Sequence, residues 1–200
     1  MKTKSLLIAF LLIGCLGFSY RQLVQLTTVP SAGGGVTTYT IIPSPVPSTS
    51  LRSDYSGLVG FCATATRDLT ITKLGRWVVS GNSQTHTVYV YSGDYVGGVN
   101  SSTTVLGSVT VNTSGATVGE VLEVVLSSPI SVASGATITV VSEETSGGDQ
   151  WYERGVYTFS ADFTACNYAY GSAGFLQNDN VVNPNNSGVF VPVNAVYTVP

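Results

Sequence analysis

In the stretch Thr85-His-Thr-Val-Tyr-Val-Tyr91, a histidine and two valines alternate with hydroxyl-bearing threonine and tyrosine side chains. Successive side chains of a β-strand point to opposite faces of the sheet. Residues 86, 88 and 90, a histidine and two valines, therefore share one face, and a threonine and two tyrosines at 87, 89 and 91 share the other. This period of two, in place of the 3.6-residue period of a helix, predicts a β-strand.

Similar stretches recur through the chain from about residue 51 onward. Ser-Gly, Gly-Asn, Gly-Gly and Asn-Pro sequences separate them, as turns do in antiparallel sheets. About nine short strands in one block predict a single all-β domain, an antiparallel β-sandwich of jelly-roll-like type. The predicted strands cover residues 58–65, 69–79, 85–91, 105–111, 121–126, 136–142, 156–159, 166–170 and 190–197.

The second of these stretches changes phase part-way along. Leu69 and Ile71 share one parity, whereas Leu74 and Val78 have the other. A strand can keep all four side chains on one face only if it contains an extra residue. We therefore predict a bulge or bend between Ile71 and Leu74.

Residues 1–15 have the form of an export signal. Lys2 and Lys4 precede an apolar run that is shorter than a membrane-spanning helix requires. The run ends in Leu-Ile-Gly-Cys15, which resembles the bacterial lipobox, whose cysteine is lipidated and becomes the first mature residue. This predicts an exported protein at the cell surface or in the extracellular space, an outer-membrane lipoprotein being one form. An ordinary signal cleaved near Ser19 and a leader that is not cleaved are the open alternatives.

Residues 16–50 are rich in proline, glycine and serine, and they predict a tether between the leader and the domain at residues 51–200. Within the tether, residues 36–42 alternate like a strand and could pair with the domain.

The low charge of the chain argues against several kinds of partner. Charged residues make up 10% of the sequence and hydrophobic residues 44%, a composition typical of extracellular all-β proteins. Six basic and eleven acidic residues lie beyond Cys15, a net charge of −5. Without a basic patch, nucleic acid is not expected as a partner, and membrane contact is expected only through the lipid anchor.

Two cysteines remain if Cys15 is lipidated. An exported protein meets an oxidising environment, so a disulfide between Cys62 and Cys166 is predicted, with two buried thiols as the alternative. The cysteine spacing fits no zinc motif, and the chain has a single histidine.

Several short motifs stand out from the alternating strands. They are Leu74-Gly-Arg-Trp77, Gly81-Asn82, Thr85-His-Thr-Val88, Ala133-Ser-Gly-Ala136, Glu144-Thr-Ser-Gly-Gly-Asp-Gln-Trp-Tyr152 and Phe190-Val-Pro-Val-Asn194. These motifs resemble those of a family of extracellular β-sandwich modules of unassigned function, which occur in multidomain bacterial surface proteins. The resemblance covers about residues 55–197. It implies a surface module of the kind often found near carbohydrate-active or adhesive domains, although this chain carries the module alone.

Two of these motifs contain the candidate ligand site. Polar groups that could bind hydroxyls and aromatic rings that could stack on a sugar are expected to meet at one end of the sandwich. A structural role stays open, because a buried Arg76 would need an acidic partner such as Glu143, Glu144 or Asp149. A fully buried Trp151 would exclude this site. The candidate residues are Arg76, Asn82, Asp149, Gln150, Trp151 and Tyr152.

Other chemistry has little support in the sequence. Glu143 and Asp149 could bind calcium across the Gly147-Gly148 turn, with ordinary turn chemistry as the alternative. His86 is expected to be a hydrogen-bonded core residue, because no nucleophile motif accompanies it. No other cofactor and no catalytic residue is predicted.

The sequence thus predicts a non-enzymatic, surface-exposed binding or adhesion module whose partner is a glycan, bound weakly, or a surface protein. The alternative is a structural or assembly subunit of an extracellular fibre, sheath or virion surface. An aromatic groove would favour the first function, and self-assembly through paired sheet edges would favour the second.

Overall fold

The computed structural model describes residues 36–43, 50–93, 104–172, 175–178 and 188–200, all within the unit Val36–Pro200. These residues contain thirteen strands and no helix, and hence no helix long and apolar enough to cross a membrane. The predicted leader, Cys15 and most of the tether lie outside the described residues. The strands are β1 (Thr38–Thr40), β2 (Leu51–Arg52), β3 (Gly57–Ala65), β4 (Leu69–Trp77), β5 (Thr85–Ser92), β6 (Val105–Asn112), β7 (Val121–Val132), β8 (Thr137–Glu144), β9 (Trp151–Val156), β10 (Phe163–Ser172), β11 (Phe175–Asn178), β12 (Gly188–Val191) and β13 (Val193–Thr198).

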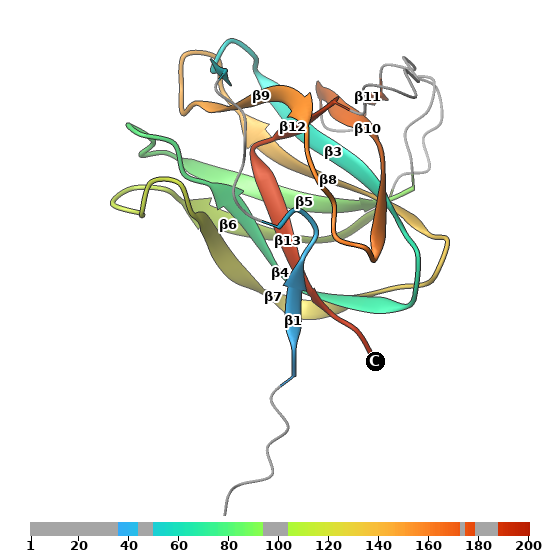
Figure 1. Ribbon diagram of the computed structural model, residues 1–200. Coiled ribbons are helices and arrows are strands. Elements are labelled where there is room, and N and C mark those ends of the chain that lie inside the picture. Colours follow the sequence, from blue (N-terminus) through green and yellow to red (C-terminus); the bar gives the residue numbers. More distant parts are fainter. Residues whose placement is uncertain (1–35, 44–49, 94–103, 173–174, 179–187) are drawn as a thin grey trace, which may run out of the picture. The chain divides into compact units, whose positions relative to one another are not determined.

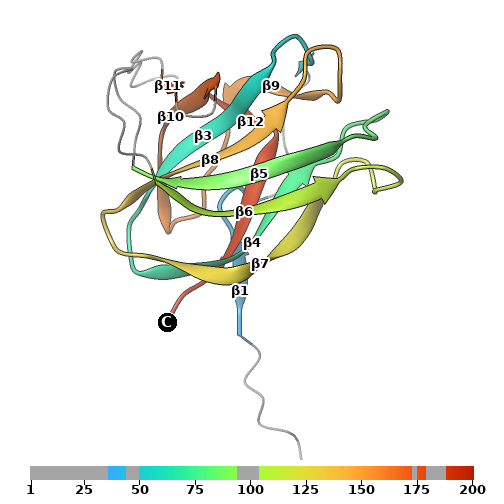
Figure 2. The same cartoon turned by 180° about the vertical axis from the view of Figure 1, so that it is seen from behind.

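The strands form three antiparallel sheets. One has four strands in the order β1-β13-β4-β7, and a second has six in the order β11-β10-β3-β8-β5-β6. Figure 2 shows β3, β8, β5 and β6 of the larger sheet side by side. The third sheet has the order β12-β9-β2 and lies at the end of the sandwich where β3 and β10 are labelled (Figure 1).

The main hydrophobic core lies between the four-stranded and six-stranded sheets. Leu74 of β4 and Ala195 of β13 belong to the same buried cluster as Phe61 of β3, Val88 of β5 and Val140 of β8. Each of these side chains is fully buried, and burial of this apolar surface is the main favourable contribution to folding. The predicted all-β sandwich is therefore confirmed, whereas its jelly-roll type stays a prediction.

The predicted irregularity in β4 is confirmed. The register of β4 against β7 shifts between Ile71 and Lys73, and the register of β13 against β4 shifts between Val196 and Tyr197. Ile71 and Leu74 are both fully buried although they differ in parity. The bulge thus keeps the apolar side chains of both halves of β4 inside the core.

Several strand boundaries differ from the prediction. Trp151 and Tyr152 begin β9 and pair with β2, whereas the sequence predicted a strand only at 156–159 in this region. The strand predicted at 190–197 is divided at Pro192, which has no N–H to donate to a ladder. The two-residue β2 and four-residue β11 have too few residues for their alternation to be recognised.

The predicted disulfide is not formed in the structure, which has Cys62 and Cys166 as thiols. Cys166 lies where the register of β10 against β3 shifts, between Ala165 and Tyr168. Its Sγ atom lies 3.4 Å from the Thr64 hydroxyl, two residues along β3 from Cys62.

Candidate functional site

The first concentration of polar side chains is centred on Arg76, which β4 carries into the protein interior. Its side chain is fully buried, as is that of Glu144 at the end of β8. Arg76 Nε and Nη2 donate to the two carboxylate oxygens of Glu144 at 3.2 and 2.8 Å. Nη1 and Nη2 also donate to the carbonyls of Trp77 and Gln150. Buried charges persist in proteins when they are paired and hydrogen-bonded in this way.

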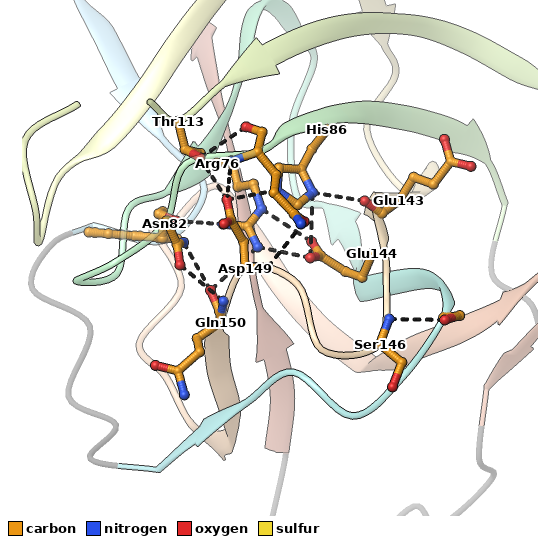
Figure 3. A network of polar contacts seen from close by, with 12 residues as sticks. Arg76, Asn82, His86, Thr113, Glu143, Glu144, Ser146, Asp149 and Gln150 are labelled. Carbon is orange, nitrogen blue, oxygen red and sulfur yellow. Dashed lines mark hydrogen bonds and ion pairs between the residues drawn. The ribbon is translucent and has the colours of Figure 1, made fainter. Parts of the chain in front are cut away.

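His86 and Asp149 extend this network (Figure 3). The two ring nitrogens of His86 lie 2.9 Å from the Glu143 carbonyl and 3.0 Å from Asp149 Oδ2. Each ring nitrogen therefore has a polar partner within hydrogen-bond distance. His86 is therefore a hydrogen-bonded core residue, as the sequence predicted.

Asp149 fixes the turn between β8 and β9 against the start of β5. Its carboxylate accepts hydrogen bonds from the backbone N–H groups of Ser83 and Gln84 and from the Thr113 hydroxyl. Burial by itself would raise the pKa of Asp149. Hydrogen bonds from Thr113, Ser83, His86 and Gln84 outweigh it and lower the pKa to about 2.

Asn82 joins the same two loops through its side-chain amide. Its Nδ2 donates to the Gln150 carbonyl, and its Oδ1 accepts from the Gln150 N–H, each at 3.0 Å. Figure 3 shows Asn82, Gln150 and Asp149 converging from the two loops. The side-chain amide of Asn82 thus pairs with the backbone of Gln150 as a neighbouring β-strand would. This pairing holds the loop before β5 against the loop between β8 and β9.

The predicted ligand site at these motifs is wrong in its central feature. Arg76 and Asp149 are buried with protein partners, and Asn82 is only 9% exposed. Trp151 is 1% exposed, and Tyr152 is half-buried with its ring against Trp77. Gln150 alone is exposed among the six predicted residues. A stacking surface formed by these residues is therefore not present at the end of the sandwich.

The calcium alternative gains no support from the geometry. The Asp149 oxygens already accept hydrogen bonds from protein donors, whereas Glu143 is exposed. Within the described residues, no three His, Cys, Asp or Glu side chains are grouped so that they could hold a metal ion. A calcium site at Glu143 and Asp149 therefore stays a prediction.

A separate pocket of about 300 Å³ lies where the three-stranded sheet meets β3 and β10. Its volume is at the lower end of the range for small-molecule sites, about 300–1,000 Å³. Val59 of β3 contributes an apolar side chain, and Arg52 and Glu153 contribute charged groups. Aromatic residues supply the rest of the lining, namely Tyr55, Trp151, Tyr168, Tyr170 and Phe190. We call this site the aromatic pocket.

Tyr170 contacts three of the other four aromatic rings in the aromatic pocket. It stacks on Tyr168 with centroids 6.1 Å apart, and it makes edge contacts with Tyr55 at 5.9 Å and Phe190 at 6.5 Å. Tyr55 and Tyr170 are half-buried, whereas the other three rings are at most 8% exposed. Burial raises the pKa of Tyr55, with a smaller contribution from Tyr170, so its hydroxyl remains protonated at neutral pH.

An ion-pair cluster is held at the edge of the pocket. Arg52 donates to both oxygens of Asp54, at 2.7 and 3.1 Å, and it lies 3.3 Å from the Glu153 carboxylate. Its guanidinium also lies 5.6 Å from the centroid of the Phe190 ring, a distance at which cation–π attraction operates. Arg52 is thereby fixed in one orientation beside the aromatic side chains.

Trp151 contributes an unusual donor to the same pocket. Its indole Nε1 is buried and has no hydrogen-bond partner within the described part of the chain. Buried polar groups are nearly always paired, and an unpaired one costs about 1–3 kcal/mol. The atom is itself buried, so a ligand acceptor in the pocket reaches it only when the indole ring moves.

The sequence indicated only part of the aromatic pocket. Trp151 was selected, but as part of another site, whereas the tyrosines at 55, 168 and 170 were not singled out. Tyr168 and Tyr170 lie two residues apart on β10, so they leave the strand on the same face. That spacing was visible in the sequence, but the meeting of β10 with the third sheet was not.

No protein-family model matches the chain, and a search of the curated proteins found no match.

Proposed function

We propose that this chain is a non-enzymatic, exported binding module and that the aromatic pocket is its ligand site. One observation carries this proposal: five aromatic side chains and an ion pair line a single pocket of about 300 Å³. Aromatic faces with a few placed polar groups are the usual composition of sites for small organic ligands. The resemblance to bacterial surface modules and the signal-like leader agree with a surface location.

A saccharide is the ligand class that this pocket suits best. The half-buried rings of Tyr55 and Tyr170 offer surfaces on which the apolar face of a sugar can stack. The partly exposed Glu153 carboxylate offers acceptors for hydroxyl groups at the edge. One small site of this size would bind weakly and would gain strength from many copies on a surface.

A glycan array probed with the full chain, followed by titration of the strongest hit, tests the proposal. Tyr170→Ala should weaken binding at least about threefold, since an aromatic stacking contact contributes about 0.5–1.5 kcal/mol. Tyr170→Phe keeps the ring and should retain most of the affinity. Tyr39→Ala is a matched control, because Tyr39 stacks on Tyr197 in another part of the domain. Unchanged binding by Tyr170→Ala would rule out the aromatic pocket as the site.

The assembly alternative has an observation of its own. Strands β1 and β7 form the two edges of the four-stranded sheet. Both edges have exposed apolar side chains: Tyr39 in β1 is 40% exposed, Val36 just before β1 is 71% exposed, and Val125 in β7 is 69% exposed. Exposed edges of this kind can pair with another chain. Analytical ultracentrifugation of the full chain and of Val125→Lys tests it, and a concentration-independent monomer would argue against assembly through these edges.

A further inference from the structure

We infer that the aromatic pocket selects an uncharged sugar unit and excludes sugars that carry a carboxylate. This inference rests on the proposed function and names the ligand class of the same site. Three features carry it: the charge at the pocket edge, the engagement of Arg52, and a donor and an acceptor on one face of β9.

The described charged groups at the pocket edge sum to −1. Arg52 contributes one positive charge, and Asp54 and Glu153 contribute two negative charges. A second negative charge placed about 6 Å from a carboxylate weakens binding by roughly threefold even at the dielectric constant of water, and by more in a partly buried site. A uronic acid would meet this repulsion, whereas the corresponding neutral hexose would not.

Arg52 is the positively charged side chain in the pocket lining that could neutralise a ligand carboxylate, but it already forms ion pairs with protein carboxylates. Its Nε and Nη2 are occupied by Asp54 and its Nη1 by Glu153, while its guanidinium lies over the Phe190 ring. Bidentate pairing of an arginine with a carboxylate is the strongest arrangement that such a ligand could make. Asp54 already occupies one bidentate edge of the guanidinium, so an anionic ligand would have to compete with Asp54 and Glu153 for Arg52.

The remaining polar groups suit a hydroxyl. Trp151 and Glu153 are two residues apart on β9, so their side chains leave the strand on the same face, and both line the pocket. The Trp151 N–H donor is buried and has no partner among the described residues, so a ligand pairs with it only when the indole moves, and the partly exposed Glu153 carboxylate offers acceptor sites. A hydroxyl group is both donor and acceptor, so one or two neighbouring hydroxyls of a sugar could bind both groups.

Titrations of the full chain with paired sugars test the inference. The probes are the methyl glycosides of glucose and galactose, each beside the methyl glycoside of its uronic acid, followed by NMR. At low salt the neutral member of a pair should bind at least about threefold more tightly. Added salt should narrow the difference by improving binding of the uronide alone. Glu153→Gln should reduce the difference in affinity between the neutral sugar and its uronic acid.

A second pair of variants tests the indole donor. Trp151→Phe should weaken neutral-sugar binding by about threefold to tenfold, the usual effect of losing one hydrogen bond. Trp77→Phe is the matched control, since Trp77 is also buried with an unpaired Nε1 but does not line this pocket. Equal losses in both variants would overturn the assigned role of Trp151.

The outcomes separate the two proposals. Equal or tighter binding of the uronides in the aromatic pocket would overturn the inference and leave the proposed function standing. Binding of sugars that Tyr170→Ala does not affect, or binding of neither member of any pair, would overturn both.

Discussion

Replacing Glu144 by glutamine should strongly destabilise the domain, because it leaves the Arg76 charge buried without a counterion. Arg76 is fully buried and makes its two side-chain hydrogen bonds, at 3.2 and 2.8 Å, with the two oxygens of Glu144. Glutamine has the same shape, but one of these oxygens becomes an NH₂ group that faces another donor. The carbonyls of Trp77 and Gln150 remain as acceptors but carry no charge.

The expected loss is about 3–5 kcal/mol, the usual cost of removing one partner of a buried ion pair. For a domain of this size the melting temperature should fall by roughly 10 °C or more. Urea unfolding of the full chain, followed by tryptophan fluorescence, measures the loss as a lower midpoint with an unchanged m-value.

Two further variants make the test specific. Glu123→Gln breaks the Lys73–Glu123 pair, whose side chains are 37% and 30% exposed, and should cost less than about 1 kcal/mol. The double variant Arg76→Met, Glu144→Gln removes the unpaired charge, so it should be less destabilised than the sum of its single variants by about 2 kcal/mol. Equal losses for Glu144→Gln and Glu123→Gln, or strict additivity in the double variant, would refute the reasoning.

Three other outcomes are expected. Asp149 has its pKa lowered from 3.8 to about 2, so its ionisation stabilises the fold fully above pH 3.8, and that stability is lost as the pH falls through 2. The free energy of unfolding of wild type should therefore exceed that of Asp149→Asn by about 2 kcal/mol at neutral pH, and a gap that does not narrow between pH 4 and 2 would contradict this. Gly60→Ala should destabilise the domain by more than about 3 kcal/mol, because a Cβ atom at this position would overlap the Val140 carbonyl oxygen of β8. Urea titration measures the loss, and a near-neutral effect would show that β3 and β8 are not paired closely at this point. Asn194→Ala removes hydrogen bonds to both the N–H and the carbonyl of Ile42. Amide hydrogen exchange should therefore become faster around β1 but not in β5, and equally faster exchange in both strands would show that Asn194 does not act locally.

The sequence predicted those features that depend on alternation and on short-range rules. The alternating stretch at 85–91 became β5, with the side chains at 86, 88 and 90 buried, and the parity change in β4 became a bulge. The need of a buried Arg76 for an acidic partner was also correct, and the partner is Glu144. These features follow from side-chain direction along one strand and from the cost of burying a charge.

The site depended on long-range pairing that no local pattern encodes. Trp151 was expected to offer a stacking face at one end of the sandwich, but pairing of β9 with β2 and β12 buries it in a third sheet. The same pairing brings Arg52 and Phe190 to the tyrosines of β10 and so forms the aromatic pocket. Contacts between residues more than a hundred positions apart, such as Arg52 with Glu153, are set by topology.

A crystal structure of the full chain with its strongest glycan-array ligand would show directly which surface binds the sugar. We expect an uncharged sugar ring in the aromatic pocket, stacked on Tyr170 and hydrogen-bonded to the Glu153 carboxylate and, after the indole moves, to Trp151 Nε1. A sugar bound instead at the loops around Asn82 and Gln150, or an anionic sugar paired with Arg52, would contradict this expectation.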